Sequence, residues 1–144
     1  MFGLGLGLGL HQSRFGGAGY SNLWYGVKIN TAIASYDAER IGSDTLHRQL
    51  PWHNKWRRCV LKDDGTVNYY LNANNSLLKE DGTPADLTGA DGQWMVEIPE
   101  HYEMFWNEGN YLCAAISEYA VPSFTRIPTI YISAGEATVE RGVN

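Results

Sequence analysis

Turn signals recur along most of this 144-residue chain and limit it to short secondary-structure elements. Turn signals, among them Asp-Asp-Gly, Asp-Gly-Thr-Pro and Asp-Gly-Gln sequences, recur about every 8–12 residues between short aromatic and β-branched runs, which is typical of an all-β protein. No apolar stripe with the helical period of about 3.6 residues lasts for a full helix. The pattern therefore predicts a mainly β fold of short antiparallel strands and hairpins, with at most one or two short helices.

One hairpin and one further strand are the clearest local predictions. The apolar runs at 57–61 and 67–71 flank an Asp-Asp-Gly turn, where glycine accepts the positive φ that a tight hairpin requires. The run at 94–98 follows an Asp-Gly turn and ends at Pro99, which has no backbone N–H to continue a ladder. Composition also predicts strands at 23–29, with a bulge at Gly26, and at 127–134.

Other segments carry weaker patterns. Residues 31–40 extend the preceding strand or form a short helix, and the sequence leaves both open. Residues 41–50 are polar, with a Gly-Ser-Asp turn signal near their start. Residues 103–110 are expected to form a polar loop, and 111–119 is the best helical candidate.

Composition and charge limit the class of partner. Hydrophobic residues make up 44% of the chain and charged residues 19%, which indicates a folded domain rather than a disordered chain. The net charge of −5 argues against nucleic acid or an anionic membrane as the main partner, because both require a basic surface. No apolar run reaches the length of about 18 residues that would insert into a membrane. Cys59 and Cys113 do not make a disulfide framework and are expected to be small buried side chains, with a bridge between them left open.

Residues 3–10 alternate glycine and leucine after Met1 and Phe2. An extended conformation would place the leucines on one face and bare glycine on the other. Glycine loses much conformational entropy on ordering, so this segment is not expected to be a stable strand by itself. It is either a flexible terminus or an anchor that becomes ordered on a partner, and we favour the anchor because an exposed leucine stripe would aggregate. The anchor residues would be Phe2, Leu4, Leu6, Leu8 and Leu10, within an anchor and linker at 1–22 that precedes a β-rich body at 23–144.

Catalytic and metal-binding motifs are scarce. The four histidines lack the spacing of metal ligands. Glu97, Glu100 and Glu103 are candidate paired carboxylates, but a solvated edge accounts for them better. The Asp-Gly turns lack the ligand layout of a calcium loop, and turn chemistry explains them. We therefore expect no catalytic residue, no metal and no cofactor.

Three tryptophans, Trp52, Trp56 and Trp106, are the candidate aromatics for a ligand or an interface. Arg57 and Arg58 follow two of them and form a basic-aromatic cluster that would stack on a base or a sugar. In an acidic chain we favour a cation–π role within the chain or between subunits.

The segment 87–102 reads Leu-Thr-Gly-Ala-Asp-Gly-Gln-Trp-Met-Val-Glu-Ile-Pro-Glu-His-Tyr. It resembles a segment of bacteriophage tail-fibre and head-fibre proteins, in which an Asp-Gly-Gln turn precedes a Met-Val-x-Ile-Pro strand and an aromatic pair. The runs 58–71 and 130–137 are similar to the preceding hairpin and the following strand of those proteins, and the Leu-Gly repeat resembles virion-attachment starts in phages of Bacteroidetes hosts. Trp94 and His101 depart from the pattern, which usually has a smaller aliphatic residue and an aromatic residue there.

The resemblance implies a virion structural protein, made in the host cytoplasm. It would be a tail or head fibre, or a fibre adaptor, attached to the particle through its N-terminus and supporting host adhesion, without enzymatic activity. The implied partners are other virion proteins (capsid, portal or tail components), further copies in a homotrimer, and a host surface glycan or protein receptor. Residues 23–144 would then be a short body or the first part of a longer fibre.

Two other functions stay open. A carbohydrate-binding module would use the exposed tryptophans as a sugar platform. An enzyme acting on surface polysaccharide would use the three glutamates as carboxylates.

Overall fold

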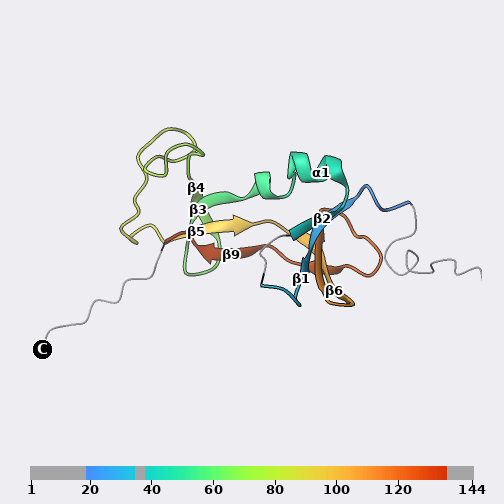
Figure 1. The fold of residues 1–144 in the computed structure, drawn as a ribbon. Helices are drawn as coiled ribbons and strands as arrows, with labels where there is room; N and C mark the ends of the chain where they lie inside the picture. The colour runs from blue at the N-terminus through green and yellow to red at the C-terminus, as the bar shows by residue number, and fades with distance from the viewer. Residues whose placement is uncertain (1–18, 35–37, 136–144) are drawn as a thin grey trace, which may run out of the picture. The chain divides into compact units, whose positions relative to one another are not determined.

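The computed structural model describes residues 19–34 and 38–135 (Figure 1). These residues form two compact units. Unit 1 contains the described residues up to Leu50 together with His101–Ile127, and unit 2 contains Pro51–Glu100 together with the described residues from Pro128 onward. The proposed anchor residues Phe2, Leu4, Leu6, Leu8 and Leu10 lie outside the described residues.

Unit 1 is built on a five-stranded antiparallel sheet. Its strands lie in the order β2-β1-β7-β6-β8, so the two longest hairpin partners, β6 and β7, pair side by side in the middle of the sheet. The strands are β1 (Trp24–Asn30), β2 (Ala38–Gly42), β6 (His101–Glu108), β7 (Tyr111–Ser117) and β8 (Thr125–Ile127).

The middle strand β7 carries small side chains on one face, and two indole rings close over them. Cys113 and Ala115 are buried, and they are flanked by Trp24 on β1 and Trp106 on β6. These two rings meet edge to face with centroids 6.3 Å apart, an arrangement that aromatic quadrupoles favour. A larger residue on β7 would hold the rings apart.

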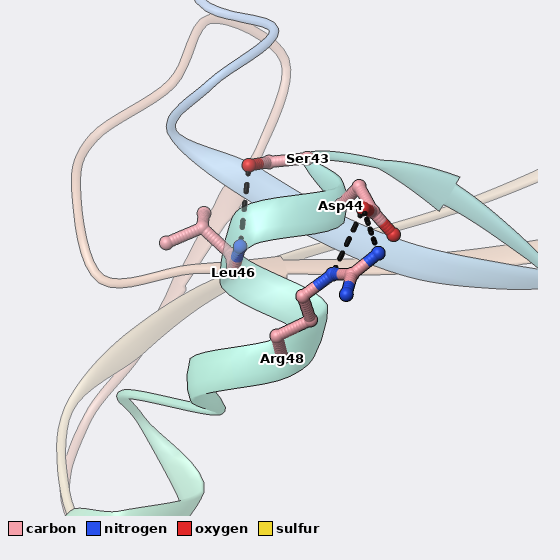
Figure 2. A network of polar contacts seen from close by, with 4 residues as sticks. All are labelled: Ser43, Asp44, Leu46 and Arg48. Carbon is pink, nitrogen blue, oxygen red and sulfur yellow. Dashed lines mark hydrogen bonds and ion pairs between the residues drawn. The ribbon is translucent and has the colours of Figure 1, made fainter.

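A short helix, α1 (Asp44–Gln49), follows β2 directly. Figure 2 shows why it begins where it does: the Ser43 hydroxyl accepts a hydrogen bond from the Leu46 N–H at 3.3 Å, which satisfies one of the free donors of the first turn. Arg48 pairs with Asp44 one turn earlier, at 2.9 Å, which adds little because both side chains are exposed. The sequence indicated a turn at 42–44 but not this helix.

Unit 2 is built on a four-stranded antiparallel sheet in the order β4-β3-β5-β9. The strands are β3 (Arg57–Leu61), β4 (Val67–Tyr70), β5 (Gln93–Ile98) and β9 (Ile130–Ser133), and a single 3₁₀ turn, η1 (His53–Lys55), precedes them. The predicted hairpin is confirmed as β3–β4, and the predicted strand ending before Pro99 is confirmed as β5.

A long connection between β4 and β5 is stabilised by polar contacts of the sheet. The Arg58 guanidinium donates to the carbonyls of Asn72 and Ala73 and to the Ser76 hydroxyl. The Tyr69 hydroxyl donates to the Asp86 carbonyl at 3.0 Å. These contacts give carbonyls of the connection hydrogen-bond partners that a neighbouring strand would otherwise provide.

Three aspartates organise the turns by the same local bond. Asp64, Asp81 and Asp86 each accept the N–H and the hydroxyl of the threonine two residues later. These bonds lower the pKa of all three carboxyl groups, because they favour the charged form. At Asp64 and Asp81 these bonds form the turns that the Asp-Gly sequences indicated, while Asp86 adds the same bond at a position where no turn was predicted.

The structure corrects three sequence-based predictions. The segment 111–119 is not a helix, because its residues 111–117 form β7; alternating burial from Leu112 onward fits a strand packed on one face. The segment 103–110 is not a polar loop, since most of it belongs to β6. Gly26 is not a bulge: it pairs in regular register with Ile41 and Ala115, and a Cβ there would collide with the Ala114 carbonyl.

Replacing Gly92 by alanine should destabilise unit 2 far more than the same change at Gly65. Both glycines have positive φ, 131° and 82°, which costs about 1–2 kcal/mol for an L-residue. Only at Gly92 would the new Cβ also collide with the Leu61 carbonyl, which adds roughly 1–3 kcal/mol of strain. Urea unfolding of the two variants measures the difference, and equal losses would contradict the close approach seen at Gly92.

Candidate functional site

The three predicted tryptophans lie in different environments. Trp52 is buried, with 7% of its surface exposed, and its indole N–H donates to the Pro99 carbonyl at 3.1 Å. Trp106 is half-buried against Trp24. Trp56 is 39% exposed and is the one member of the predicted set that offers a ring to solvent.

Trp52 and Trp56 are brought together, with His53 between them. Their ring centroids lie 5.2 Å apart, edge to face, and the His53 ring tilts against Trp56 at 5.3 Å. Partial burial lowers the pKa of His53, because a desolvated imidazole resists protonation. Trp52, His53 and Trp56 therefore form a cluster of three rings in mutual contact within unit 2. Trp106 belongs to unit 1 and is not part of this cluster.

The predicted basic-aromatic cluster forms with a different ring. The Arg57 guanidinium lies 3.4 Å from the centroid of the Tyr70 ring and pairs with Glu80 at 2.8 Å. Arg58 is engaged by the connection after β4. Both arginines therefore have partners within unit 2, and the cation–π contact of Arg57 falls on the neighbouring strand rather than on a tryptophan.

Glu97 is the centre of a polar cluster on the four-stranded sheet. The hydroxyls of Tyr70 on β4 and Tyr131 on β9 both donate to its carboxylate, at 3.0 Å and 2.9 Å. Burial and this carboxylate raise the pKa of Tyr131 to about 12. The Glu97 carboxylate thus accepts hydrogen bonds from two phenol groups and links side chains of three strands, β4, β5 and β9, which is a structural role.

The other two candidate glutamates differ in setting. Glu100 is exposed at the end of unit 2, while Glu103 lies on β6 in unit 1 with 31% of its side chain exposed. The Glu103 carboxylate lies 3.7 Å from Nε2 of the buried His101.

An apolar sheet face is the largest feature that the sequence reasoning missed. Residues directly opposite one another in a ladder, and residues two apart in a strand, share one face. The register of β1, β7 and β6 therefore places five apolar side chains on the same side of the unit 1 sheet. We call these residues the open sheet face: Val27, Ile29, Phe105, Leu112 and Ala114.

Among residues 19–34 and 38–135, helix α1 covers one end of this open sheet face. Helix α1 packs beside Tyr25, whose ring lies 5.4 Å from that of His47. Farther along, Ile29, Leu112 and Phe105 are 39%, 42% and 62% exposed. Several neighbouring exposed apolar side chains mark an interaction surface more strongly than a single one does.

Both cysteines are free and fully buried. Burial raises the pKa of the Cys59 and Cys113 thiols, because a thiolate is disfavoured away from water. They act as small apolar side chains in the two units.

Residues 19–34 and 38–135 hold no group of three or more His, Cys, Asp or Glu side chains arranged to bind a metal ion. No helix in the same residues is long and apolar enough to cross a membrane.

No family model, no curated protein and no solved structure matches this chain.

Neither cysteine should react with a thiol reagent while the protein is folded. Both side chains have 0% exposure, so Ellman's reagent should label neither in buffer and both in denaturant. The variant Ser21→Cys provides a control, because residue 21 is exposed and should react at once. Rapid labelling of the native wild-type chain would contradict the burial of these thiols.

Tyr131 should ionise well above the ordinary tyrosine pKa of 10.0 in the folded protein. Its pKa is about 12 when folded and 10.0 ordinarily, so the neutral phenol stabilises the fold below pH 10 and this contribution is lost as pH rises from 10 to 12. Absorbance titration near 295 nm should lose the step near pH 12 in Tyr131→Phe and keep it in Tyr119→Phe, which alters an exposed ring. Retention of that step in Tyr131→Phe would show that another tyrosine carries it.

Proposed function

We propose that this chain is a structural protein of a bacteriophage virion: a tail or head fibre, or a fibre adaptor, that supports host adhesion. It attaches to the particle through residues 1–22 and presents the β-rich body. Its partners are other virion proteins and further copies of the chain in a homotrimer, and its role is assembly and adhesion rather than catalysis.

One observation carries the proposal. The three stretches that resemble fibre proteins are far apart in the sequence, yet they form β3 and β4, then β5, then β9, which are neighbours in a single sheet. Stretches that together supply all four strands of one sheet support a shared folding unit more than scattered matches would, although the last two residues of the second stretch, His101 and Tyr102, begin β6 in unit 1. The departure at Trp94 lies within this sheet, where the ring is half-buried and packs near Gly135.

The open sheet face supports the proposal that this protein assembles with other subunits. Apolar side chains left exposed on a sheet are stabilised when another surface covers them, by roughly 25 cal/mol for each Å² of apolar area removed from water. Subunits that repeat around an axis would cover such a face in every copy.

A carbohydrate-binding module remains the second proposal, with less support. A sugar platform needs exposed, coplanar rings, and Trp52 is buried while Trp106 is packed edge to face against Trp24. Trp56 alone keeps a partly exposed ring. Binding on a glycan array that is lost in Trp56→Ala would favour this second function.

Deleting residues 1–12 should abolish incorporation into particles while leaving the body folded. The deletion removes the leucine stripe, whose burial on a partner would hold the protein in the virion. Mass spectrometry of purified particles from infected cells that express the tagged chain measures incorporation.

A matched variant distinguishes the effect of losing the leucine side chains from the effect of shortening the chain. Replacing Leu4, Leu6, Leu8 and Leu10 together by serine keeps the length and should have the same effect as the deletion. Circular dichroism of each variant checks that the sheets remain. Wild-type levels of the truncated chain in particles would rule out the anchor.

A further inference from the structure

A groove with a volume of about 330 Å³ lies in unit 1, along the β6–β8 edge of its sheet. It is lined by Glu103, Met104, Phe105, Ser123 and Thr125. Glu103 and Thr125 are directly opposite in the ladder, and Phe105 is two residues along from Glu103, so these three share a face. The volume is at the small end of ligand pockets, roughly 300–1,000 Å³, which suits one side chain better than a large ligand.

The groove exists because β8 stops early. Strand β8 pairs only with the first three residues of β6, while β6 continues to Glu108. The chain just before β8 turns away: the Phe124 N–H bonds to the Val121 carbonyl, and the Phe124 ring packs on Trp24, which belongs to the other face of the sheet. This detour leaves a hollow beside Phe105.

Ser123 is at the rim of the groove in a costly conformation. Its φ of 73° lies in the left-handed region, which is uncommon for a residue other than glycine. Residues held in such conformations are found most often at active sites and ligand-binding positions.

The polar groups of the groove are acceptors, and its apolar wall is an aromatic ring. Within the described residues no lysine or arginine forms an ion pair with Glu103, whose neighbour His101 is charged only when protonated. The hydroxyls of Ser123 and Thr125 are exposed and have no hydrogen-bond partner among those residues. Phe105 is 62% exposed, so most of this side chain is open to a ligand.

We propose that this groove binds an arginine side chain of a partner protein. A guanidinium is planar and carries five N–H donors, so it can donate to the Glu103 carboxylate and to the hydroxyls while its plane stacks on Phe105. The carboxylate repels an anionic ligand, and the net charge of −5 attracts a basic partner. A lysine ammonium would meet the carboxylate but could not stack as a plane.

The open edge of β6 indicates how the arginine is presented. From Met104 to Glu108 the outer edge of β6 has no strand partner among the described residues. An extended segment can add to such an edge through main-chain hydrogen bonds, while a side-chain pocket provides selectivity. The occupant is therefore an extended, basic segment whose arginine enters the groove.

This inference goes beyond the proposed function, because the groove lies in the folded body and does not depend on attachment to a particle. A failure to bind arginine would leave virion incorporation untouched. A failure of incorporation would leave arginine binding untouched.

The test uses the full chain and small probes. Acetyl-arginine-amide is titrated to about 20 mM, several times the millimolar Kd expected for so small a ligand, while amide resonances are followed by NMR. The expected result is saturable shifts confined to 103–105 and 123–125. The citrulline analogue has the same shape without the charge and should bind at least about tenfold more weakly, as expected when a charged hydrogen bond of about 1.5–3 kcal/mol is lost.

Two variants measure separately what the Glu103 carboxylate and the Phe105 ring contribute to arginine binding. Glu103→Gln keeps the shape of the side chain and should weaken arginine binding about tenfold or more, through loss of the charged hydrogen bond. Phe105→Leu keeps an apolar wall without a ring and should weaken it about two- to fivefold, because an exposed cation–π contact is worth roughly 0.5–1 kcal/mol. Leu112→Ser is the matched control: it alters an exposed apolar residue outside the groove and should leave the affinity unchanged.

Several outcomes would overturn the proposal. Equal binding of arginine and citrulline, or unchanged affinity in both Glu103→Gln and Phe105→Leu, would show that the groove is not a guanidinium site. Shifts at 103–105 and 123–125 caused by methyl glycosides and not by arginine would assign the groove to a saccharide instead. An absence of shifts with arginine in the correctly folded wild-type chain would leave the groove without this function.

Discussion

Each unit of this protein depends on one interior strand whose side chains are withdrawn from water. In the five-stranded sheet that strand is β7, where Cys113 and Ser117 are almost completely buried. In the four-stranded sheet it is β3, where the adjacent Cys59 and Val60 are completely buried on opposite faces. The one polar member, Ser117, has its hydrogen bonds satisfied, since its hydroxyl donates to the Leu23 carbonyl and accepts from the Tyr119 N–H. Small side chains at these positions let the neighbouring rings and aliphatic groups close over them, so both cores are thin.

A thin core leaves apolar surface uncovered, and this links the fold to the proposed role. Helix α1 has only six residues and covers the Tyr25 end of its sheet, so the open sheet face continues past it. The edge of β6 is likewise unpaired beyond Glu103, within the part of the chain that the structure describes. Unpaired edges and apolar faces are liabilities in an isolated monomer, but they are the usual contact surfaces of a protein that assembles. The polar cluster around Glu97 has the opposite character, because its acceptors are occupied by the chain itself.

The sequence predicted the local structure best where turns and prolines carry it. The β3–β4 hairpin and the end of β5 at Pro99 follow from residues that restrict the backbone directly. The prediction of secondary structure was wrong where pairing with a neighbouring strand determines the conformation of a segment. The segment that forms β7 is apolar on both faces, through Leu112, Ala114 and Ile116 on one side and Cys113 and Ala115 on the other, and such a run fits a buried helix or an interior strand equally well. The polar residues of β6 suggested a loop, but a strand beside β7 has its backbone bonds supplied by that neighbour. For the candidate surface, the sequence named Trp56 as an exposed aromatic but missed Phe105, because exposure depends on which strand ends early beside it.

The sequence by itself determined that the chain is mainly β and where several of its turns lie, because these depend on residue type and spacing along the chain. Only the tertiary structure decided which faces are covered. The register of β1, β7 and β6 places Ile29, Leu112 and Phe105 on one side of a sheet, and the short length of β8 opens the groove beside Glu103. These are contacts between residues that are up to about eighty positions apart, and a period of two in a single strand gives no information about the strand or helix that will lie against it.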